Sequence, residues 1–165
     1  MSPQASVLVP AAPLCGEVDR LLPAGWVWEG RRTLHLGSTL VGGKAPALAL
    51  DDASLDLVVA TSVFTPLADH WSGWLLELHR LLAPGGILIG GFPGEELSRA
   101  VAEVPWGQAR TGTTLTANGE SFDVAGCRLL VSPWWTCARW QQAFDILRIE
   151  PSGFNGHGVV VARKP

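Results

Sequence analysis

The sequence predicts an α/β protein with a mostly parallel sheet and a C-terminal antiparallel hairpin. An apolar run, ASLDLVVATSVF (53–64), precedes an amphipathic stretch, DHWSGWLLELHRLLAPGG (69–86), and a second apolar run, ILIGGF (87–92). A strand, a helix and a strand joined by short links form a right-handed parallel crossover. Two β-rich runs, FDILRIEPSG (144–153) and HGVVVARKP (157–165), are separated by a turn, which favours an antiparallel pair.

The overall composition indicates one domain over residues 1–165, with residues 1–13 expected to form a loose arm. The chain is 47% hydrophobic and 16% charged, which is enough to bury a core. A net charge of -3 without a basic stretch argues against nucleic-acid binding. No apolar run approaches the length of about 18 residues that a membrane span needs. No basic segment precedes the first apolar residues, so we expect a cytoplasmic protein.

Three cysteines, Cys15, Cys127 and Cys137, are an odd number at wide spacing. This pattern fits neither a disulfide framework nor a metal-binding knuckle, so we expect reduced thiols and no metal site.

The N-terminal third contains one short helix and one strand. Residues 16–25 predict a helix with Val18, Leu21 and Leu22 on one face, ended by Pro23 and Gly25. The stretch WVWEG (26–30) fits a strand or a loop. RTLHLG (32–37) predicts a strand that ends at a glycine.

The central segment carries the clearest patterns. The nearly continuous apolar run at 55–60 is typical of a strand buried on both faces. The next helix is predicted from apolar residues at helical spacing, and Pro84-Gly85-Gly86 ends it. Its apolar positions are Trp71, Trp74, Leu75, Leu78, Leu81 and Leu82.

After Phe92 the patterns are weaker. Residues 93–104 predict a helix, and GTTLTANG (112–119) and CRLLVS (127–132) fit strands or a substrate-side insert. A further helix is predicted in SPWWTCARWQQAF (132–144), with Ser132 as the N-cap and a proline at its first position.

Residues 48–92 resemble the class I S-adenosylmethionine-dependent methyltransferases of the small-molecule or sugar-modifying type. LALDDASLDLVVATSVFTPL (48–67) is similar to the family's acidic turn and central strand, and WLLELHRLLAPGGILIGGF (74–92) to its next helix and strand. Residues 132–165 resemble the family's last helix and terminal hairpin. The resemblance implies a Rossmann-like sheet and S-adenosylmethionine as the cofactor.

The resemblance also implies that this sheet is truncated. In the family, the first strand ends in a glycine-rich turn at the methionine part of the cofactor, and a second strand supplies an acid for the ribose. RTLHLGSTLVGG can be aligned with that first strand, with Gly37 on the first glycine and His35 where the family has an acid. Only thirteen residues separate Gly37 from Asp51, whereas a βαβ unit takes about 30. The half of the sheet that holds adenine and ribose is expected to be absent.

Two other interpretations of this region are weaker. Residues 26–30 could be the second strand, with Glu29 as the ribose acid, but the first strand would then fall in residues 1–13, where prolines replace the glycines that close backbone approach requires. The segment GSTLVGGK (37–44) does not fit the phosphate-loop pattern in either register.

If a cofactor binds, the resemblance and the strand ends indicate its contacts: Gly37, Ser38, Asp52, Thr61, Ser62 and Phe64. A pair of solvated turn residues is the favoured interpretation of Asp51 and Asp52. Pro66 stands where the family often has a histidine, which leaves His157 as the catalytic candidate, with a surface loop histidine as the alternative. Three tryptophans in 134–140 fit a buried core or interface, or a stacking platform for a sugar or aromatic ligand.

Two functions remain open. The first is a degenerate methyltransferase-like protein that is non-catalytic on its own, a pseudo-enzyme or partner subunit without a cofactor in the isolated chain. The alternative is an active methyltransferase of a small molecule or sugar whose cofactor site is completed by another chain. A cleft for another small ligand at the strand ends also fits.

The shortened sheet also predicts association. The strand at 32–37 should lie near a sheet edge with uncovered apolar faces, which favours pairing. We therefore expect a homodimer or a complex with a methyltransferase-like partner, with Arg31 and Arg32 at the rim, and neither a nucleic-acid nor a membrane partner.

Overall fold

The computed structural model describes residues 16–37, 48–61, 63–64, 71–92, 94–96, 99, 113–117, 127–154 and 157–165. The side chains of 113–117 and 127–131 are not among them. The expected arm at 1–13 lies outside the described residues. None of the helices in these ranges is long and apolar enough to cross a membrane.

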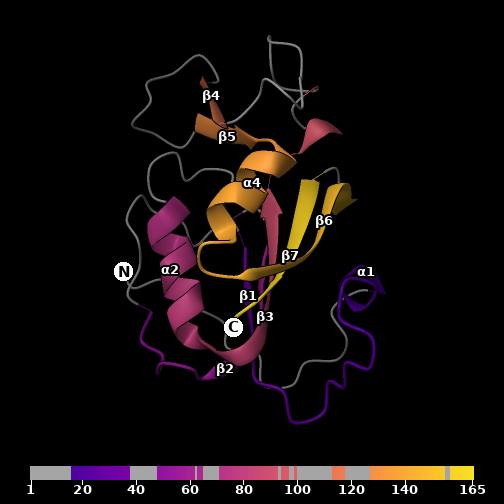
Figure 1. Cartoon of the computed structure of the whole chain (residues 1–165), viewed down its shortest axis with the longest axis vertical. Helices are drawn as coiled ribbons and strands as arrows, with labels where there is room; N and C mark the ends of the chain where they lie inside the picture. Colours follow the sequence, from indigo (N-terminus) through magenta and orange to yellow (C-terminus); the bar gives the residue numbers. More distant parts are fainter. Residues whose placement is uncertain are drawn as a thin grey trace.

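A five-stranded mixed sheet forms the centre of the fold, in the order β1-β2-β3-β7-β6 (Figure 1). Its strands are β1 (Thr33–Leu36), β2 (Leu55–Ala60), β3 (Leu82–Phe92), β6 (Asp145–Phe154) and β7 (His157–Arg163). The first three are parallel to one another, and β7 is antiparallel to both β3 and β6. The predicted parallel pair and the predicted C-terminal hairpin are both confirmed.

Two further strands, β4 (Thr113–Ala117) and β5 (Cys127–Val131), form a separate antiparallel pair. They correspond to the two stretches for which strands or an insert were predicted. Of the helix predicted at 93–104, residues 95, 96 and 99 are helical, and most of the remainder lies outside the described residues.

The predicted central helix is confirmed as α2 (Trp71–Leu81), and the predicted last helix as α4 (Pro133–Trp140). Ser132 has the extended backbone of an N-cap residue, although its side chain does not cap the helix. The first helix is shorter than predicted: α1 (Gly16–Asp19) is a single turn. The chain turns away before Pro23, and Gly25 has a φ of 82°, which helical backbone excludes.

The sheet buries a different set of side chains on each face, because successive residues of a strand point to opposite faces. One face carries Leu34, Leu36 and Val58 against α2 and the aromatic rings of Trp140 and Phe144. The other face is covered by residues of α1 and of the segment after it. That second cluster comprises Leu57, Val59, Ile87, Ile89, Val159, Val161, Val18 and Leu21, with Leu22, Trp26 and Trp28 at its margin.

The position of β1 was predicted correctly, but its exposure was not. It is an outer strand of the described sheet, as the shortened sequence implied. However, Leu34 and Leu36 are both fully buried, so the prediction of uncovered apolar faces on this strand is wrong for these two side chains. Both side chains point to the face that α2 covers, and the opposite face is covered by residues of the N-terminal segment.

We predict that Gly90→Ala destabilises the fold. A Cβ at this position in β3 would lie 2.5 Å from Cη2 of the buried Trp140 ring, so helix α4 must shift away from the sheet. Overpacking of this kind costs about 1–3 kcal/mol in the free energy of unfolding, measurable by urea denaturation. Gly16→Ala is the control, since no atom lies within 4 Å of its Cβ. Equal effects of the two changes would contradict the tight packing of α4.

Candidate functional site

The carboxyl ends of β1 and β2 are joined by a small polar contact. Nε2 of His35 lies 3.2 Å from Oγ1 of Thr61, and the backbone N–H of Thr61 donates to the carbonyl of Leu36 at 3.1 Å. The strand register pairs Leu36 with Ala60, so Gly37 and Thr61 are the next residues at the same end. A Cβ on Gly37 would meet no atom within 4 Å, so the space beside it is open.

Burial lowers the pKa of the His35 imidazole below its ordinary value. At neutral pH this ring is therefore uncharged, and it can accept a hydrogen bond from Thr61 or donate one to it. The pair can position a polar ligand or exchange a proton with one.

The structure brings together only some of the predicted site residues. Gly37 and Thr61 are neighbours, and Phe64 is buried close by along the chain, with its ring centroid 4.8 Å from that of Trp140. His157 is half-buried and begins β7 opposite Phe154. Ser38 and Ser62 lie outside the described residues.

Asp52 is at the other end of the sheet from these residues. It precedes the amino end of β2, whereas Thr61 follows the carboxyl end, and the six residues of β2 span about 20 Å. The carboxylate of Asp52 is paired with the guanidinium of Arg80. The structure therefore does not bring Asp52 together with Gly37 and Thr61.

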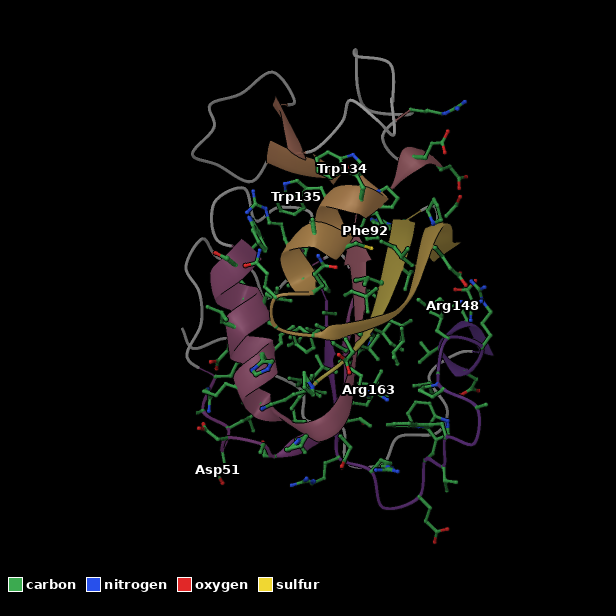
Figure 2. All side chains as sticks on the ribbon, in the orientation of Figure 1. Asp51, Phe92, Trp134, Trp135, Arg148 and Arg163 are labelled. Atoms are coloured by element: carbon green, nitrogen blue, oxygen red, sulfur yellow. The ribbon has the colours of Figure 1, made fainter. Side chains whose placement is uncertain are left out.

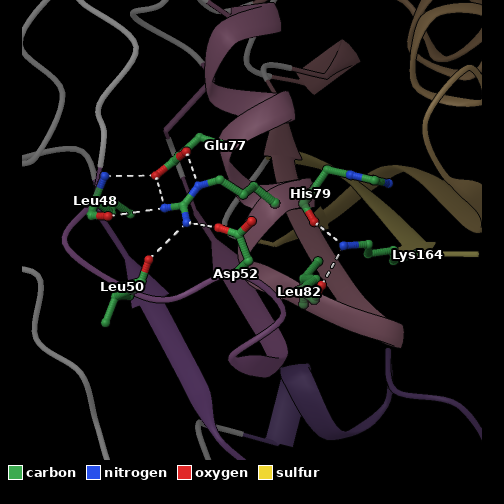
Figure 3. A network of polar contacts seen from close by, with 8 residues as sticks. Leu48, Leu50, Asp52, Glu77, His79, Leu82 and Lys164 are labelled. Carbon is green, nitrogen blue, oxygen red and sulfur yellow. Dashed lines mark hydrogen bonds and ion pairs between the residues drawn. The ribbon is translucent and has the colours of Figure 1, made fainter.

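Arg80 holds the segment before β2 against helix α2 through what we call the Arg80 bracket (Figure 3). Its Nε and one Nη donate to the two carboxylate oxygens of Glu77, at 2.9 and 2.7 Å. Its remaining N–H groups donate to the carbonyls of Leu48 and Leu50, at 3.1 and 2.9 Å, and to Asp52. All five donors of the guanidinium are used.

Two further bonds close the bracket. The N–H of Leu48 donates to Glu77 at 2.8 Å, and the N–H of Ala53 donates to the carbonyl of Arg80 at 2.9 Å. Arg80 lowers the pKa of Glu77, chiefly through its hydrogen bonds, with a further contribution from the N–H of Leu48, while burial acts in the opposite direction. Glu77 and Asp52 in turn raise the pKa of Arg80. The bracket therefore stays charged throughout the neutral range.

A second cation caps the end of α2. The ammonium group of Lys164 donates to the carbonyls of His79 and Leu82, at 2.8 and 2.7 Å (Figure 3). These carbonyls lack partners within the helix, and a cation there also offsets the helix dipole. Burial, followed by the charge of Lys164, lowers the pKa of His79, whose ring meets Phe144 edge to face at 5.1 Å.

The tryptophans of α4 differ in how deeply they are buried. Trp140 is buried in the core, whereas Trp134 is 48% exposed. Figure 2 labels Trp134 and Trp135 on this helix. Trp135 is partly buried, with the ring of Trp71 at 4.8 Å and the guanidinium of Arg139 at 5.9 Å from its ring. Core packing is thus confirmed for Trp140, and an exposed indole remains at Trp134. In the described part of the chain, no three metal-binding side chains cluster, and Cys137 is a free thiol.

Sequence reasoning did not identify Arg80 or Lys164 as important residues. The only signal for Arg80 was the spacing of Glu77 and Arg80 on one helix face, which is common on exposed helices. Its carbonyl partners lie about thirty residues earlier in the chain, and no side-chain pattern marks a backbone acceptor.

We predict that Arg80→Lys lowers the midpoint of thermal unfolding. A lysine has three donors and no planar fork, so it cannot serve Glu77, Asp52 and two carbonyls together. Arg99→Lys is the matched control, since the contact described for Arg99 is an exposed ion pair with Glu95. The role assigned to the bracket is wrong if both variants have the same midpoint of thermal unfolding as the parent protein.

We also predict that stability falls as the pH is lowered through the histidine range. The folded-state pKa values of His35 and His79 lie below the ordinary 6.5, so the unfolded chain binds more protons just below that pH. The contribution of the two histidines to the free energy of unfolding is fully present above their unfolded-state pKa. It is lost as the pH falls through their folded-state pKa values. The urea midpoint should drop between about pH 7.5 and about pH 5.5, the interval around the ordinary histidine pKa. His79→Gln should flatten this slope, and an unchanged slope in that variant would contradict the assignment to His79.

Three comparisons place this geometry among known proteins. Residues 27–90 match the sequence model of a family described as a methyltransferase domain. No curated protein matches the chain.

Solved structures match over most of the chain at low identity. An S-adenosylmethionine-dependent methyltransferase from Thermotoga maritima, described as a possible histamine N-methyltransferase, is 17% identical with a TM-score of 0.58, over 90% of this chain and 86% of its own. Burkholderia thailandensis 1,6-didemethyltoxoflavin-N1-methyltransferase, with bound S-adenosylhomocysteine, is 16% identical with a TM-score of 0.50, over 70% and 47%.

A third match is the complex between the Haloferax volcanii Trm112 methyltransferase activator and a methyltransferase, at 16% identity and a TM-score of 0.52, over 76% of this chain and 60% of that one. The chain spans only 47% to 64% of the length of several matched proteins, whose activities belong to those longer chains. The resemblance seen in the sequence is confirmed: this chain has the fold of the class I S-adenosylmethionine-dependent methyltransferases, and residues 27–90 match a methyltransferase domain.

Proposed function

We propose that this chain is a degenerate methyltransferase-like protein that is non-catalytic on its own and acts as a pseudo-enzyme or as the partner subunit of another protein. The observation that carries the proposal is the order of the strands, because β1, β2 and β3 are neighbours in the sheet and also follow one another in the chain.

This strand order bears directly on ligand binding. In open α/β sheets, the ligand crevice forms where the strand order reverses and the flanking helices move to opposite faces. The described parallel strands step in one direction only, from β1 to β2 to β3, without such a reversal. Residues 38–47 are ten residues, too few for the helix, strand and helix that would create one. The described residues therefore do not fit the nucleoside half of S-adenosylmethionine.

The charges around the strand ends support the same proposal. S-adenosylmethionine carries a cationic sulfonium and an ammonium group, whereas the polar pair at the carboxyl ends of β1 and β2 is a neutral imidazole and a hydroxyl. Two carboxylates next to β2 lie at its other end: Asp52 binds Arg80 and Asp56 binds Arg31 and Arg32, all at the amino end of β2. At the carboxyl end, burial is the cause that shifts the pKa of His35, and no carboxylate of the described residues raises it.

The partner is proposed as a second copy of this chain or a methyltransferase-like protein. Support for a protein partner comes from the structural match in which a protein of this fold is in complex with the Trm112 methyltransferase activator. The outer position of β1 is the place where a second chain could extend the sheet.

One observation favours the alternative of an active methyltransferase of a small molecule or sugar. The Thermotoga protein described as S-adenosylmethionine-dependent is covered over 86% of its length, so a chain of similar extent can carry that description. In that case another chain would complete the cofactor site by supplying the residues that bind the nucleoside of the cofactor.

Titration calorimetry of the purified chain with S-adenosylmethionine and S-adenosylhomocysteine tests the proposal. We expect no saturable heat of binding up to millimolar ligand, because the described strands contain no reversal of order at which a nucleoside could bind. Submillimolar binding by the chain alone would contradict the proposal. Gly37→Trp, which fills the open space beside β1, is the control that would place any such binding at this site.

A further inference from the structure

The second face of the sheet is covered by a segment that is attached to it only by side chains. Residues 16–31, which we call the strap, contain α1 and an irregular stretch after it. Val18 and Leu21 are buried on Leu57, Val59, Ile87, Ile89, Val159 and Val161. The strap thus shields six aliphatic side chains from three neighbouring strands.

The backbone–backbone hydrogen bonds described for the strap are all local. They join Arg20 to Gly16, Leu21 and Leu22 to Val18, Trp26 to Pro23 and Arg31 to Trp28. The first described backbone–backbone bond to the sheet is at Arg32, whose carbonyl accepts from the N–H of Asp56 at 2.8 Å. Strands of the sheet, in contrast, share a ladder of backbone bonds. The strap can therefore leave without breaking that ladder.

Arginine contacts hold the far end of the strap. Arg20 pairs with Glu150 of β6 at 3.3 Å and donates to the carbonyl of Gly153. Arg148 donates to the carbonyl of Arg20 at 3.0 Å and also pairs with Glu150. The side chains of Arg20 and Arg148 are about half exposed, which makes these contacts individually weak. We call these contacts the latch.

One feature of the strap opposes its closed state: the indole N–H of Trp26 is buried without a hydrogen-bond partner among the described residues. At the end where the strap meets β1, Gly30 has a φ of 74°, a conformation that glycine adopts readily. The next residue, Arg31, pairs with Asp56 of β2 at 3.7 Å through a side chain that is 44% exposed. The strap therefore has a latch at one end, and at the other a glycine turn beside one exposed ion pair.

We propose that the strap opens as a unit while the sheet remains folded, so that it is a latched cover of an apolar face. Opening of the strap does not depend on cofactor binding. The proposal therefore goes beyond the proposed function, and its test can fail while the proposed function stands. It also explains how a chain with a shortened sheet keeps that face out of water without a second protein.

Two valines of β7 report on the opening from opposite faces. Val161 lies under the strap, and Val160 lies on the face that α2 and α4 cover; they are 2% and 0% exposed. In the variants Val161→Cys and Val160→Cys, the rate of thiol labelling under native conditions is followed at the engineered cysteine by peptide mass spectrometry, which separates it from the natural thiols. Opening of the strap exposes only the first cysteine, whereas unfolding of the sheet exposes both.

We expect the cysteine at position 161 to react at least about tenfold faster than the one at 160, since local opening requires less free energy than global unfolding. Adding Arg20→Gln, which removes the ion pair of the Arg20 side chain with Glu150 from the latch, should raise the rate at 161 roughly fivefold, the effect of losing an ordinary exposed ion pair, and leave the rate at 160 unchanged.

Arg163→Gln is the matched control. It removes an arginine of similar exposure that pairs with Asp145 at 2.8 Å, outside the strap, and should alter neither rate. Equal labelling rates at 160 and 161, or equal acceleration of both by Arg20→Gln, would mean that the strap opens only when the whole fold opens, and the proposal would be overturned.

Discussion

The guanidinium of Arg80 is the contact on which the shortened sheet depends. It uses all five of its donors to fasten the chain before β2 to helix α2, and the N–H groups of Leu48 and Ala53 bond back. Residues 48–53, the described part of the connection before β2, form neither a helix nor a strand, so their backbone groups need partners elsewhere. Arg80 and Glu77 supply them, so β2 enters the sheet beside β1.

Shortening the sheet changes what its two ends can do. Among the described residues, the amino end of β2 gathers carboxylates and arginines that stabilise the connection, and the side-chain contact at the carboxyl ends of β1 and β2 is the neutral pair of His35 and Thr61. The charged groups thus serve the fold, and the end where a cofactor would lie has little to attract a cation. The apolar face that becomes vulnerable is covered by Val18, Leu21 and the residues that follow them.

Patterns within one segment were predictable from the sequence, and contacts between distant segments were not. Helix α2 and its flanking strands followed from apolar spacing, and the truncation from the count of residues after Gly37. The burial of Leu34 and Leu36 did not, because no pattern in RTLHLG showed that helix α2 would cover the face to which these two side chains point. The ion pair of Asp52 with Arg80 was not predictable either, because the two residues lie 28 positions apart and no local pattern joins them.

The central claim is that the carboxyl ends of β1 and β2 lack the nucleoside half of a cofactor site. It is tested most directly by a nuclear magnetic resonance titration of the isotope-labelled chain with adenosine alone, which separates that half from the methionine half. The account predicts no saturable change in the amide signals of Gly37 and Thr61 at millimolar adenosine. A saturable shift of both signals, absent from residues at the amino end of β2, would contradict it.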